Sequence, residues 1–211
     1  GGAAYFPNAI YLTDPGQFLN LLFKQLIDQG LRFHQSSVVR LTRHKSGVEA
    51  TLASGGRISA KQIIIACGAT PVVPDIPGAE FGITSDDFFE LKNRPNKTIV
   101  AGSGYIAIEL AGILNALGSD VKLLARKNSI LRKFDQSIKS AAIDYLVESG
   151  VEVILNTNIL AIKKDDSQLL VETDKEDHSS VDAVLWAIGR KPLVADLALE
   201  KTKVTRDQNN F

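Results

Sequence analysis

Cysteine and methionine are scarce in this chain, which holds one cysteine, Cys67, and no methionine among its 211 residues. A single thiol can form no internal disulfide and supplies no thiolate cluster, so we expect no metal site. Charge of one sign is not in excess either, because Lys plus Arg and Asp plus Glu both number 24. Nucleic-acid-binding and polybasic membrane-docking proteins carry a basic surplus. We therefore expect neither a nucleic-acid partner nor a membrane partner.

Long hydrophobic runs are also missing. The longest, Ile63–Cys67 and Val184–Ile188, have the length of a strand and fall far short of a membrane span. No charged leader followed by an apolar stretch opens the chain, so we see no targeting peptide and expect a cytoplasmic protein. Since the chain opens with Gly1, lacks methionine and stops at Phe211 just after an expected strand, we expect a fragment or an excised piece of a longer protein.

What the chain does contain is the balance of a globular protein, with 45% apolar and 23% charged residues. Its first part shows helix-start residues from Asp14, an apolar stripe at helical spacing closed by Gly30, and then alternating strand patterns. We expect one helix and four strands there, at 14–30, 38–44, 48–52, 57–59 and 62–66, the last of them buried. A stretch rich in proline, from Pro71 to Gly78, predicts a linker.

The second part alternates strands with helices. Strands are expected at 98–101, 121–125 and 151–155, with helices at 105–117 and 135–149. This alternation is typical of a parallel sheet in an α/β fold. Three further strands, at 159–164, 168–173 and 181–187, follow without helices and predict a small meander that returns to the sheet.

A glycine motif stands directly after the first of these strands. Residues 102–107 fit the pattern G-x-G-x-x-A at the start of a helix. Gly102 permits the tight turn, Gly104 lets a pyrophosphate approach the backbone, and Ala107 allows close packing of helix on strand. The phosphates would lie on the free N–H groups at the positive end of the helix. We therefore expect a Rossmann-like dinucleotide site.

The end of the second strand indicates which dinucleotide is bound. An NAD site places an acid there to hold the ribose hydroxyl, whereas this chain has Arg126 and Lys127, with Arg132 shortly after. Guanidinium groups pair with a 2′-phosphate through charge-assisted, often bidentate bonds. The alternative is that these residues and Lys133 form an ordinary solvated basic loop. Together with the glycine motif they favour NADP(H).

Four motifs carry a family resemblance. They lie at residues 82–89, 101–112, 125–132 and 185–192, and in order and spacing they resemble the pyridine nucleotide-disulfide oxidoreductase family, of the glutathione reductase type, over residues 63–211. The resemblance implies NADPH and FAD as cofactors, with Tyr105 as an aromatic gate over the nicotinamide and Glu109 beside it. The residues expected to bind NADPH are Gly102, Ser103, Gly104, Tyr105, Ile106, Ala107, Glu109, Arg126, Lys127, Arg132, Ala187, Ile188, Gly189 and Arg190. Those expected near FAD are Ala66, Cys67, Gly68 and Thr70.

Purely structural roles for these residues stay open as alternatives. Tyr105 is alternatively an ordinary first-turn residue, and Glu109 a surface carboxylate near a helix N-terminus. Cys67 is expected to be a small packing residue rather than a nucleophile.

The chain also departs from that family. It lacks the first FAD-binding glycine motif, the redox-active cysteine pair and the C-terminal dimerisation domain with its catalytic histidine. Its three histidines, His34, His44 and His178, have no partner spacing, and we expect them at the surface. Two motifs near the start of the chain, at Tyr5–Asn8 and Thr13–Pro15, and the helix that follows them are instead similar to amine-oxidising flavoproteins related to D-amino-acid oxidase, a resemblance that covers residues 1–70. The alternatives are a recombined sequence and a divergent chain of one family.

We expect three segments: a partial FAD-domain-like segment at 1–75, an NADP(H)-binding domain at 76–188, and a truncated return toward the FAD domain at 189–211. The resemblance implies a homodimeric parent enzyme that passes hydride from NADPH to FAD and on to a small-molecule disulfide such as glutathione disulfide. Without a cysteine pair the chain itself is expected to be inactive. The other hypotheses are a non-catalytic NADPH-binding fragment or chimera, and an amine-oxidising FAD-dependent oxidoreductase.

Overall fold

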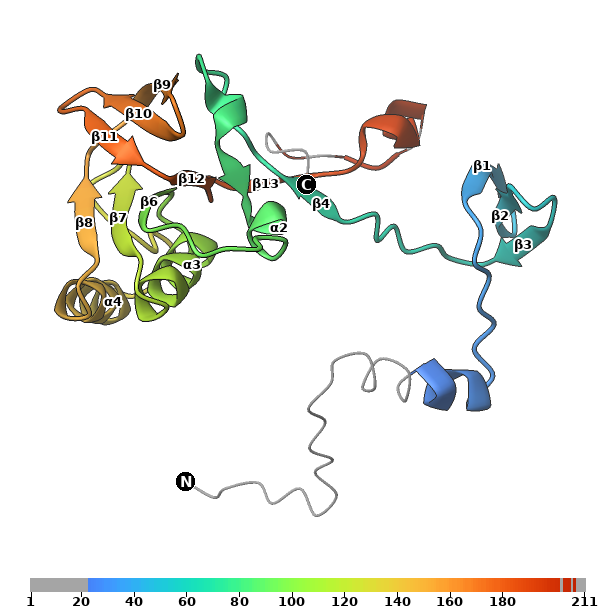
Figure 1. Cartoon of the computed structure of the whole chain (residues 1–211). Coiled ribbons are helices and arrows are strands. Elements are labelled where there is room, and N and C mark those ends of the chain that lie inside the picture. Colours follow the sequence, from blue (N-terminus) through green and yellow to red (C-terminus); the bar gives the residue numbers. More distant parts are fainter. Residues whose placement is uncertain (1–22, 202, 206, 208–211) are drawn as a thin grey trace, which may run out of the picture. The chain divides into compact units, whose positions relative to one another are not determined.

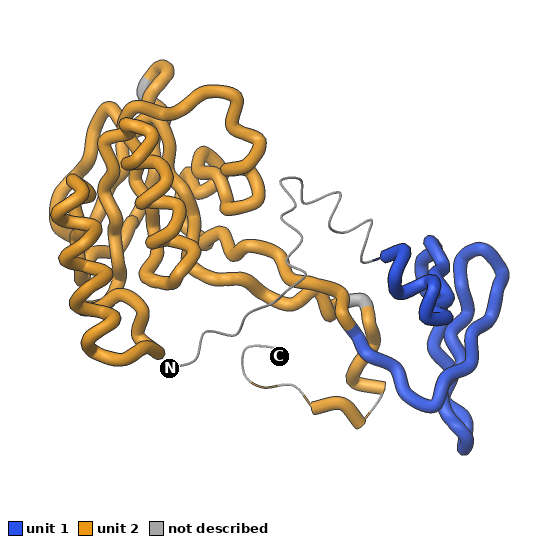
Figure 2. The backbone as a smooth tube through the Cα atoms, turned by 90° about the horizontal axis from the view of Figure 1, so that it is seen from below, with its two compact units in different colours: residues 1–65 blue, residues 66–211 orange. Residues whose placement is uncertain are grey.

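The structure is a computed structural model that describes residues 23–201, 203–205 and 207 (Figure 1). The motifs expected between Tyr5 and Pro15, and the first half of the helix expected there, lie outside the described residues. The chain divides into two compact units, residues 1–65 and 66–211 (Figure 2). The segment boundaries expected near residues 75 and 188 stay predictions.

The first unit contains a small antiparallel sheet. Residues 23–28 are helical, and β1 (Val38–His44), β2 (Gly47–Leu52) and β3 (Arg57–Ala60) then pair in the order β1-β2-β3. They confirm the three strands that the alternating sequence pattern predicted at 38–44, 48–52 and 57–59. The turn between β2 and β3 contains Gly55 with φ +86°, a left-handed conformation that glycine adopts without steric strain.

The prediction of a buried strand at 62–66 is wrong. Residues 62–68 have no regular structure, and the side chain of Ile64 is 91% exposed. Apolar β-branched residues form a strand only where a neighbouring strand supplies backbone partners and packing. None of the described strands pairs with this stretch. Cys67, expected to be a packing residue, is likewise an exposed free thiol.

The second unit is built on a five-stranded parallel sheet, which confirms the expected α/β, Rossmann-like class. Its strand order is β5-β12-β6-β7-β8. The strands are β5 (Ile83–Thr84), β6 (Lys97–Ala101), β7 (Asp120–Ala125), β8 (Glu152–Leu155) and β12 (Ala183–Trp186).

Helices cover one face of this sheet. They are α2 (Ser85–Phe88), α3 (Tyr105–Ala116) and α4 (Gln136–Glu148), and the last two match the expected helices closely. Glycines follow the ends of α3 and α4, Gly118 with φ +92° and Gly150 with φ +102°. Side chains at alternate strand positions point to this face, because strand residues alternate between the two faces of a sheet. Val100, Leu123 and Leu185 are each 0% exposed in the resulting core.

An antiparallel meander covers the opposite face. It consists of β9 (Ile159–Asp165), β10 (Gln168–Thr173) and β11 (His178–Val181), in the order β11-β10-β9. Its apolar side chains form a second core with strand residues that include Ile99 and Trp186. The buried indole nitrogen of Trp186 donates a hydrogen bond of 2.9 Å to the carbonyl oxygen of residue 79.

The single strand expected at 181–187 is in fact two strands in different sheets. Val181 ends β11 in the meander, and Ala183 begins β12 in the parallel sheet. Asp182 lies between them, and its carboxylate accepts hydrogen bonds from the backbone N–H groups of Asn96 (2.8 Å) and Lys97 (2.9 Å). These bonds turn the chain from one sheet into the other, which a continuous apolar pattern cannot reveal.

Two further features differ from the sequence expectations. His34 and His44 are exposed as expected, but His178 at the start of β11 is 7% exposed, so its surface assignment is wrong. The strand pattern of the meander carries its side chain inward. The proline-rich stretch is not a free linker within the second unit, since the N–H of Ile162 in β9 donates to the carbonyl oxygen of Pro77 at 2.9 Å.

A two-stranded antiparallel ribbon joins distant parts of the sequence. It pairs β4 (Ala69–Pro71) with β13 (Arg190–Pro192). Single-turn 3₁₀ helices complete the described fold, at 79–81, 195–197 and 199–201.

Candidate nucleotide-binding site

The glycine loop connects the end of β6 to the start of α3. Gly102 has φ +152°, and a Cβ atom there would overlap the carbonyl oxygen of Ala187 and lie 3.0 Å from the Cβ of Ala107. Its N–H donates to the carbonyl oxygen of Leu124 at 2.9 Å. The loop is therefore packed against β7, β12 and α3 at once. Only glycine fits at its first position.

The second glycine faces open space. Gly104 caps α3 with φ −88° and ψ 175°, and a Cβ atom added to it would meet no atom within 4 Å. No side chain caps this end of the helix of 12 residues. Free N–H groups at a helix N-terminus attract anions, and the absent side chain leaves room for one. The loop thus has the shape and the donors that a pyrophosphate needs.

The site lies at a topological switch point of the sheet. From β6 the chain passes to β7 and β8 on one side and then returns to β12 on the other. Ligands of open α/β sheets bind where the strand order reverses, at the carboxyl ends of the strands. The N–H of Ala187 donates to the carbonyl oxygen of Ala101 at 2.8 Å. This bond holds Ala187 next to the end of β6, from which the glycine loop starts, and the roles expected for residues 187–189 in nucleotide binding stay predictions.

The basic loop after β7 is tied to the glycine loop. The N–H of Leu131 donates to the carbonyl oxygen of Ser103 at 2.7 Å, and the N–H of Asn156 donates to that of Lys127 at 3.2 Å. Leu131 has φ +47°, a strained conformation for a branched residue. Its side chain enters the core, while the neighbouring Arg132 stays exposed.

The cationic side chains of this loop are available to a ligand. Arg126, Lys127 and Arg132 are all exposed. None of the three forms an ion pair with a residue that the structure describes. Free guanidinium groups next to an open helix N-terminus suit a ligand with a further phosphate beyond the pyrophosphate.

The predicted nicotinamide-pocket residues, Tyr105 and Glu109, lie on the first turns of α3, and Ile188, expected to bind NADPH, follows β12. Tyr105 is 59% exposed, Ile188 is 44% exposed, and Glu109 is exposed one turn after Tyr105. The roles of Tyr105 and Glu109 stay predictions, as do the assignments of Ala66, Cys67, Gly68 and Thr70 near a flavin. The carbonyl oxygen of Gly68 accepts from the N–H of residue 193 at 3.0 Å, and Thr70 pairs with residue 191 in the ribbon.

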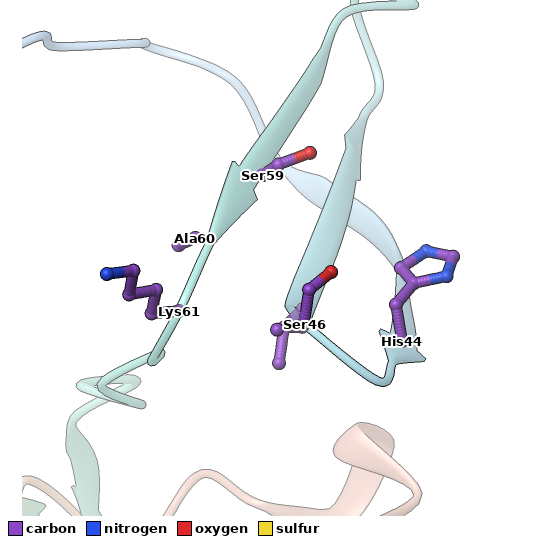
Figure 3. A pocket seen from close by; sticks show the side chains of 7 residues that line it. His44, Ser46, Ser59, Ala60 and Lys61 are labelled. Atoms are coloured by element: carbon purple, nitrogen blue, oxygen red, sulfur yellow. The ribbon is translucent and has the colours of Figure 1, made fainter.

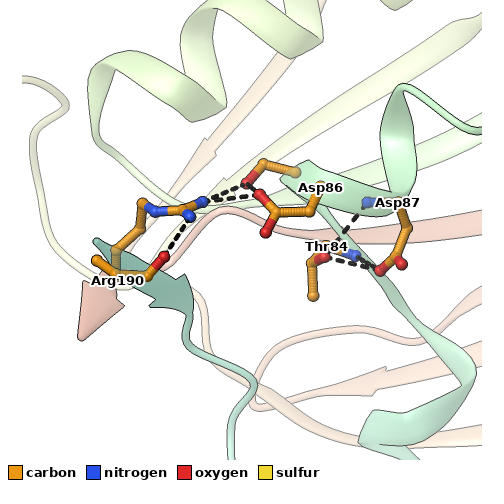
Figure 4. A network of polar contacts seen from close by, with 6 residues as sticks. Thr84, Asp86, Asp87 and Arg190 are labelled. Carbon is orange, nitrogen blue, oxygen red and sulfur yellow. Dashed lines mark hydrogen bonds and ion pairs between the residues drawn. The ribbon is translucent and has the colours of Figure 1, made fainter. Parts of the chain in front are cut away.

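Arg190 is engaged by neighbouring protein groups (Figure 4). Its guanidinium group donates to the carbonyl oxygen of Ala69 (2.6 Å), to Asp86 Oδ1 (2.8 Å) and to Ser85 Oγ (3.3 Å). Sequence reasoning placed Arg190 with the nucleotide and assigned no role to Ser85 or Asp86. The local signal was the polar run at 84–87, which starts a short helix.

A capping box organises that run. The N–H and Oγ1 of Thr84 both donate to Asp87 Oδ2, at 2.8 and 2.7 Å, and the N–H of Asp87 donates back to Thr84 Oγ1 at 3.5 Å. These hydrogen bonds from Thr84 lower the pKa of the Asp87 carboxyl. Because Asp87 serves the cap, Asp86 is left to pair with Arg190.

Two pockets lie away from these residues. One, of about 220 Å³, is in the first unit and is lined by His44, Ser46, Gly47, Val48, Ser59, Ala60 and Lys61 (Figure 3). His44 and Lys61 point in opposite directions there, so they do not converge on a ligand. The other, of about 240 Å³, lies at the amino ends of β6 and β7. The described residues contain no cluster of metal-binding side chains, and no described helix is long and apolar enough to span a membrane.

The fold is of the Rossmann type, and its glycine loop has the form of a dinucleotide-binding loop. The model of the pyridine nucleotide-disulphide oxidoreductase family matches residues 16–211. The chain belongs to this family, as the sequence motifs predicted. The matched range includes residues 16–70, part of the segment that the sequence motifs had likened to amine-oxidising flavoproteins.

Curated relatives include two glutathione reductases. The chain is 40% identical over 157 residues to the enzyme of Yarrowia lipolytica, which covers 72% of this chain and 33% of that protein. It is 43% identical over 151 residues to the enzyme of Schizosaccharomyces pombe, covering 69% and 32%. The chain therefore spans about a third of the length of these relatives.

A solved structure shares the fold over almost the whole chain. It is the HOCl-induced flavoprotein disulfide reductase RclA from Escherichia coli, with a TM-score of 0.76 and 28% identity over 92% of this chain and 44% of that one. The family and its flavoprotein members support FAD and NADPH as cofactors. The open glycine loop and the free arginines fit the NADPH half of that pair.

Proposed function

We propose that this chain is the NADPH-binding part of a flavin-dependent disulfide reductase of the glutathione reductase type. In the parent reaction, hydride passes from NADPH to FAD and its electrons pass on to a disulfide such as glutathione disulfide. The observation that carries this proposal is the bond between Leu131 N–H and the Ser103 carbonyl oxygen. It joins the open glycine loop to a loop whose two arginines form no ion pair within the described part of the chain.

The arginines select the phosphorylated nucleotide. Arg126 and Arg132 would hold the 2′-phosphate, with Lys127 adding positive charge. An acid at the end of β7 would repel that phosphate, and this strand ends instead in buried Ala125 followed by Arg126. Charge-assisted bonds to phosphate are about twice as strong as neutral ones. NADPH is therefore favoured over NADH by contacts that only NADPH can make.

The remaining residues position the other half of the nucleotide. The N–H groups at the start of α3 would bind the pyrophosphate, next to Gly104. Tyr105 and Ile188 present exposed apolar surface beside the glycine loop, and they would cover the nicotinamide and keep water from it. Glu109 would lie near the same ring. The bound cofactors supply the hydride chemistry, and the chain supplies binding and orientation.

The chain by itself is proposed to bind NADPH without reducing a disulfide. Its one cysteine, Cys67, cannot form the dithiol–disulfide couple that disulfide exchange requires. In the parent enzyme the remaining two thirds would supply that couple, and a second subunit would complete a homodimer.

Calorimetric titration of the purified chain with NADPH and with NADH tests this function. We expect saturable binding of NADPH that is much tighter than binding of NADH. An absorbance scan of the same preparation checks for flavin, which would favour a retained FAD site. Equal affinity for the two nucleotides, or binding of neither, contradicts the proposal.

A further inference from the structure

Segment 187–190 follows β12 beside the glycine loop, and beyond its buried first residue, Ala187, it has little packing of its own. Ile188 and Gly189 are exposed, and a Cβ atom on Gly189 would meet no atom within 4 Å. Gly189 has φ +141°, a conformation that only glycine adopts readily. Hydrogen bonds rather than side-chain packing must therefore fix the path of this backbone.

Three anchors hold the segment. At its start, the N–H of Ala187 donates to the carbonyl oxygen of Ala101 at 2.8 Å. Near its end, the carbonyl oxygen of Gly189 accepts from the N–H of Val72 at 2.9 Å. The third anchor is the side chain of Arg190, which reaches Asp86 on α2 and the carbonyl oxygen of residue 69 on β4.

We propose that Asp86 is a positioning residue, which acts through Arg190 to hold Ile188 and Gly189 at the nicotinamide end of the nucleotide site. The inference rests on the proposed function and extends it to a residue that does not contact the nucleotide. Nothing in the expected binding set assigns a role to Asp86.

The location of α2 suits this role. It follows β5, whose Thr84 pairs with Trp186 of β12 in parallel register. The carboxyl ends of these two strands are therefore neighbours, and α2 starts beside the point where β12 gives way to segment 187–190. The capping box between Thr84 and Asp87 fixes the first turn of α2. The carboxylate of Asp86 is thus held facing the guanidinium group of Arg190 (Figure 4).

The pair serves geometry more than stability. The side chains of Arg190 and Asp86 are 33% and 61% exposed, and exposed ion pairs contribute little to the free energy of unfolding. The pair does contribute to the orientation of Arg190, because its planar guanidinium group makes three hydrogen bonds, two to α2 and one to β4. Removing the Asp86 charge frees one side of that anchor while the ribbon and α2 remain.

The test compares two ligands of the purified chain. NADPH reaches the whole site, whereas adenosine 2′,5′-bisphosphate fills the half next to Arg126 and Arg132. We expect Asp86→Asn to weaken NADPH binding roughly threefold to tenfold, since one charge-assisted contact is weakened indirectly. Binding of the bisphosphate and the thermal unfolding midpoint should not change. Asp86→Glu, which keeps the charge, should restore part of the NADPH affinity.

Glu90→Gln provides the matched control, because it removes an exposed carboxylate after α2 that does not contact Arg190. Amide signals of Ile188 and Gly189 in the free chain should move in Asp86→Asn and not in Glu90→Gln. The inference is overturned if Asp86→Asn leaves NADPH binding unchanged, weakens both ligands equally, or acts no more strongly than Glu90→Gln. Failure of the unmodified chain to bind the bisphosphate would instead overturn the proposed function on which the inference rests.

Discussion

Gly102 and Ala187 lie so close together that a Cβ atom on the glycine would overlap the carbonyl oxygen of the alanine. The two residues directly follow neighbouring strands, β6 and β12, on either side of the switch point. Since no other residue fits against Ala187 here, the fold itself requires glycine at this position, independently of nucleotide binding.

Gly102→Ala should therefore destabilise the second unit. The new methyl group must displace the backbone of residue 187 or the Cβ of Ala107, and overpacking of this kind costs about 1–3 kcal/mol. The positive φ of Gly102 adds strain for any other residue. Urea unfolding followed by circular dichroism measures the change. A stability equal to that of the unmodified chain would show that the loop adapts freely.

Gly104→Ala should have the opposite profile. A methyl group there meets no protein atom within 4 Å, and the φ of −88° suits alanine, so the free energy of unfolding should stay nearly constant. The same methyl group would occupy the space needed by the pyrophosphate, and NADPH affinity should fall at least tenfold, or about 1.4 kcal/mol. Calorimetry and urea unfolding of this variant and of Gly102→Ala separate binding from folding. Unchanged NADPH affinity in Gly104→Ala would argue against the proposed position of the phosphates.

Arg126→Ala and Arg132→Ala should each weaken NADPH binding roughly tenfold to a hundredfold, because a hydrogen bond to a charged group contributes about 1.5–3 kcal/mol. NADH binding should barely change, since NADH lacks the 2′-phosphate. Lys133→Ala is the matched control, because it removes a neighbouring exposed cation with no predicted ligand contact. Parallel titrations with both nucleotides decide the matter, and equal losses for NADPH and NADH would refute the assignment of these arginines.

Local patterns in the sequence predicted most of the second unit. Strand-length apolar runs, the glycine loop and the glycines at helix ends gave β6, α3, β7, α4 and β8 to within about one residue, because each of these signals acts over a few neighbouring positions. The glycine and arginine motifs also predicted which two loops would bind phosphate, and the structure joins these loops by the bond between Leu131 and Ser103. Local consistency of this kind is what a regular α/β unit requires.

The features that were missed depend on contacts distant in sequence. The run at 62–66 has strand propensity, but propensity cannot supply a partner strand. The break at Asp182 depends on the N–H groups of Asn96 and Lys97, which lie 86 and 85 residues earlier. The pairing of Arg190 with Asp86 spans 104 residues. No periodicity within a single segment records such contacts.

Asp182 gives a prediction for stability against pH. Its pKa lies below the ordinary value of 3.8, first because the backbone N–H of Lys97 donates to it and then because Gln168 does. A lowered pKa in the folded state means that ionised Asp182 stabilises the fold above the unfolded pKa. This contribution is lost as the pH falls through the folded value.

Asp182→Asn should therefore lower the free energy of unfolding by about 1 kcal/mol near neutral pH, the typical net value of a hydrogen bond. The difference from the unmodified chain should shrink as the pH falls from the ordinary carboxyl pKa of 3.8 through the lower pKa of folded Asp182, where the unmodified carboxyl also becomes protonated. Urea unfolding across the acid range measures this convergence. Asp120→Asn, which removes an exposed carboxylate from β7, is the control. A difference that stays constant with pH would mean that shape rather than charge is responsible.

The last prediction is that the chain, without further segments, reduces no glutathione disulfide. Hydride can leave NADPH only toward an acceptor that is held within reach and oriented. Electrons could then reach a disulfide only through a thiolate pair, and the chain has one cysteine, which is exposed and unpaired. The site proposed for the nucleotide contains a glycine loop, an open helix terminus and two arginines, so NADPH binding should persist where turnover does not. The measurement adds FAD, NADPH and glutathione disulfide in excess and follows NADPH absorbance, with a full-length glutathione reductase as the positive control. Oxidation of NADPH that requires both the chain and the disulfide would contradict this prediction, and loss of that oxidation in Cys67→Ser would assign it to the one thiol.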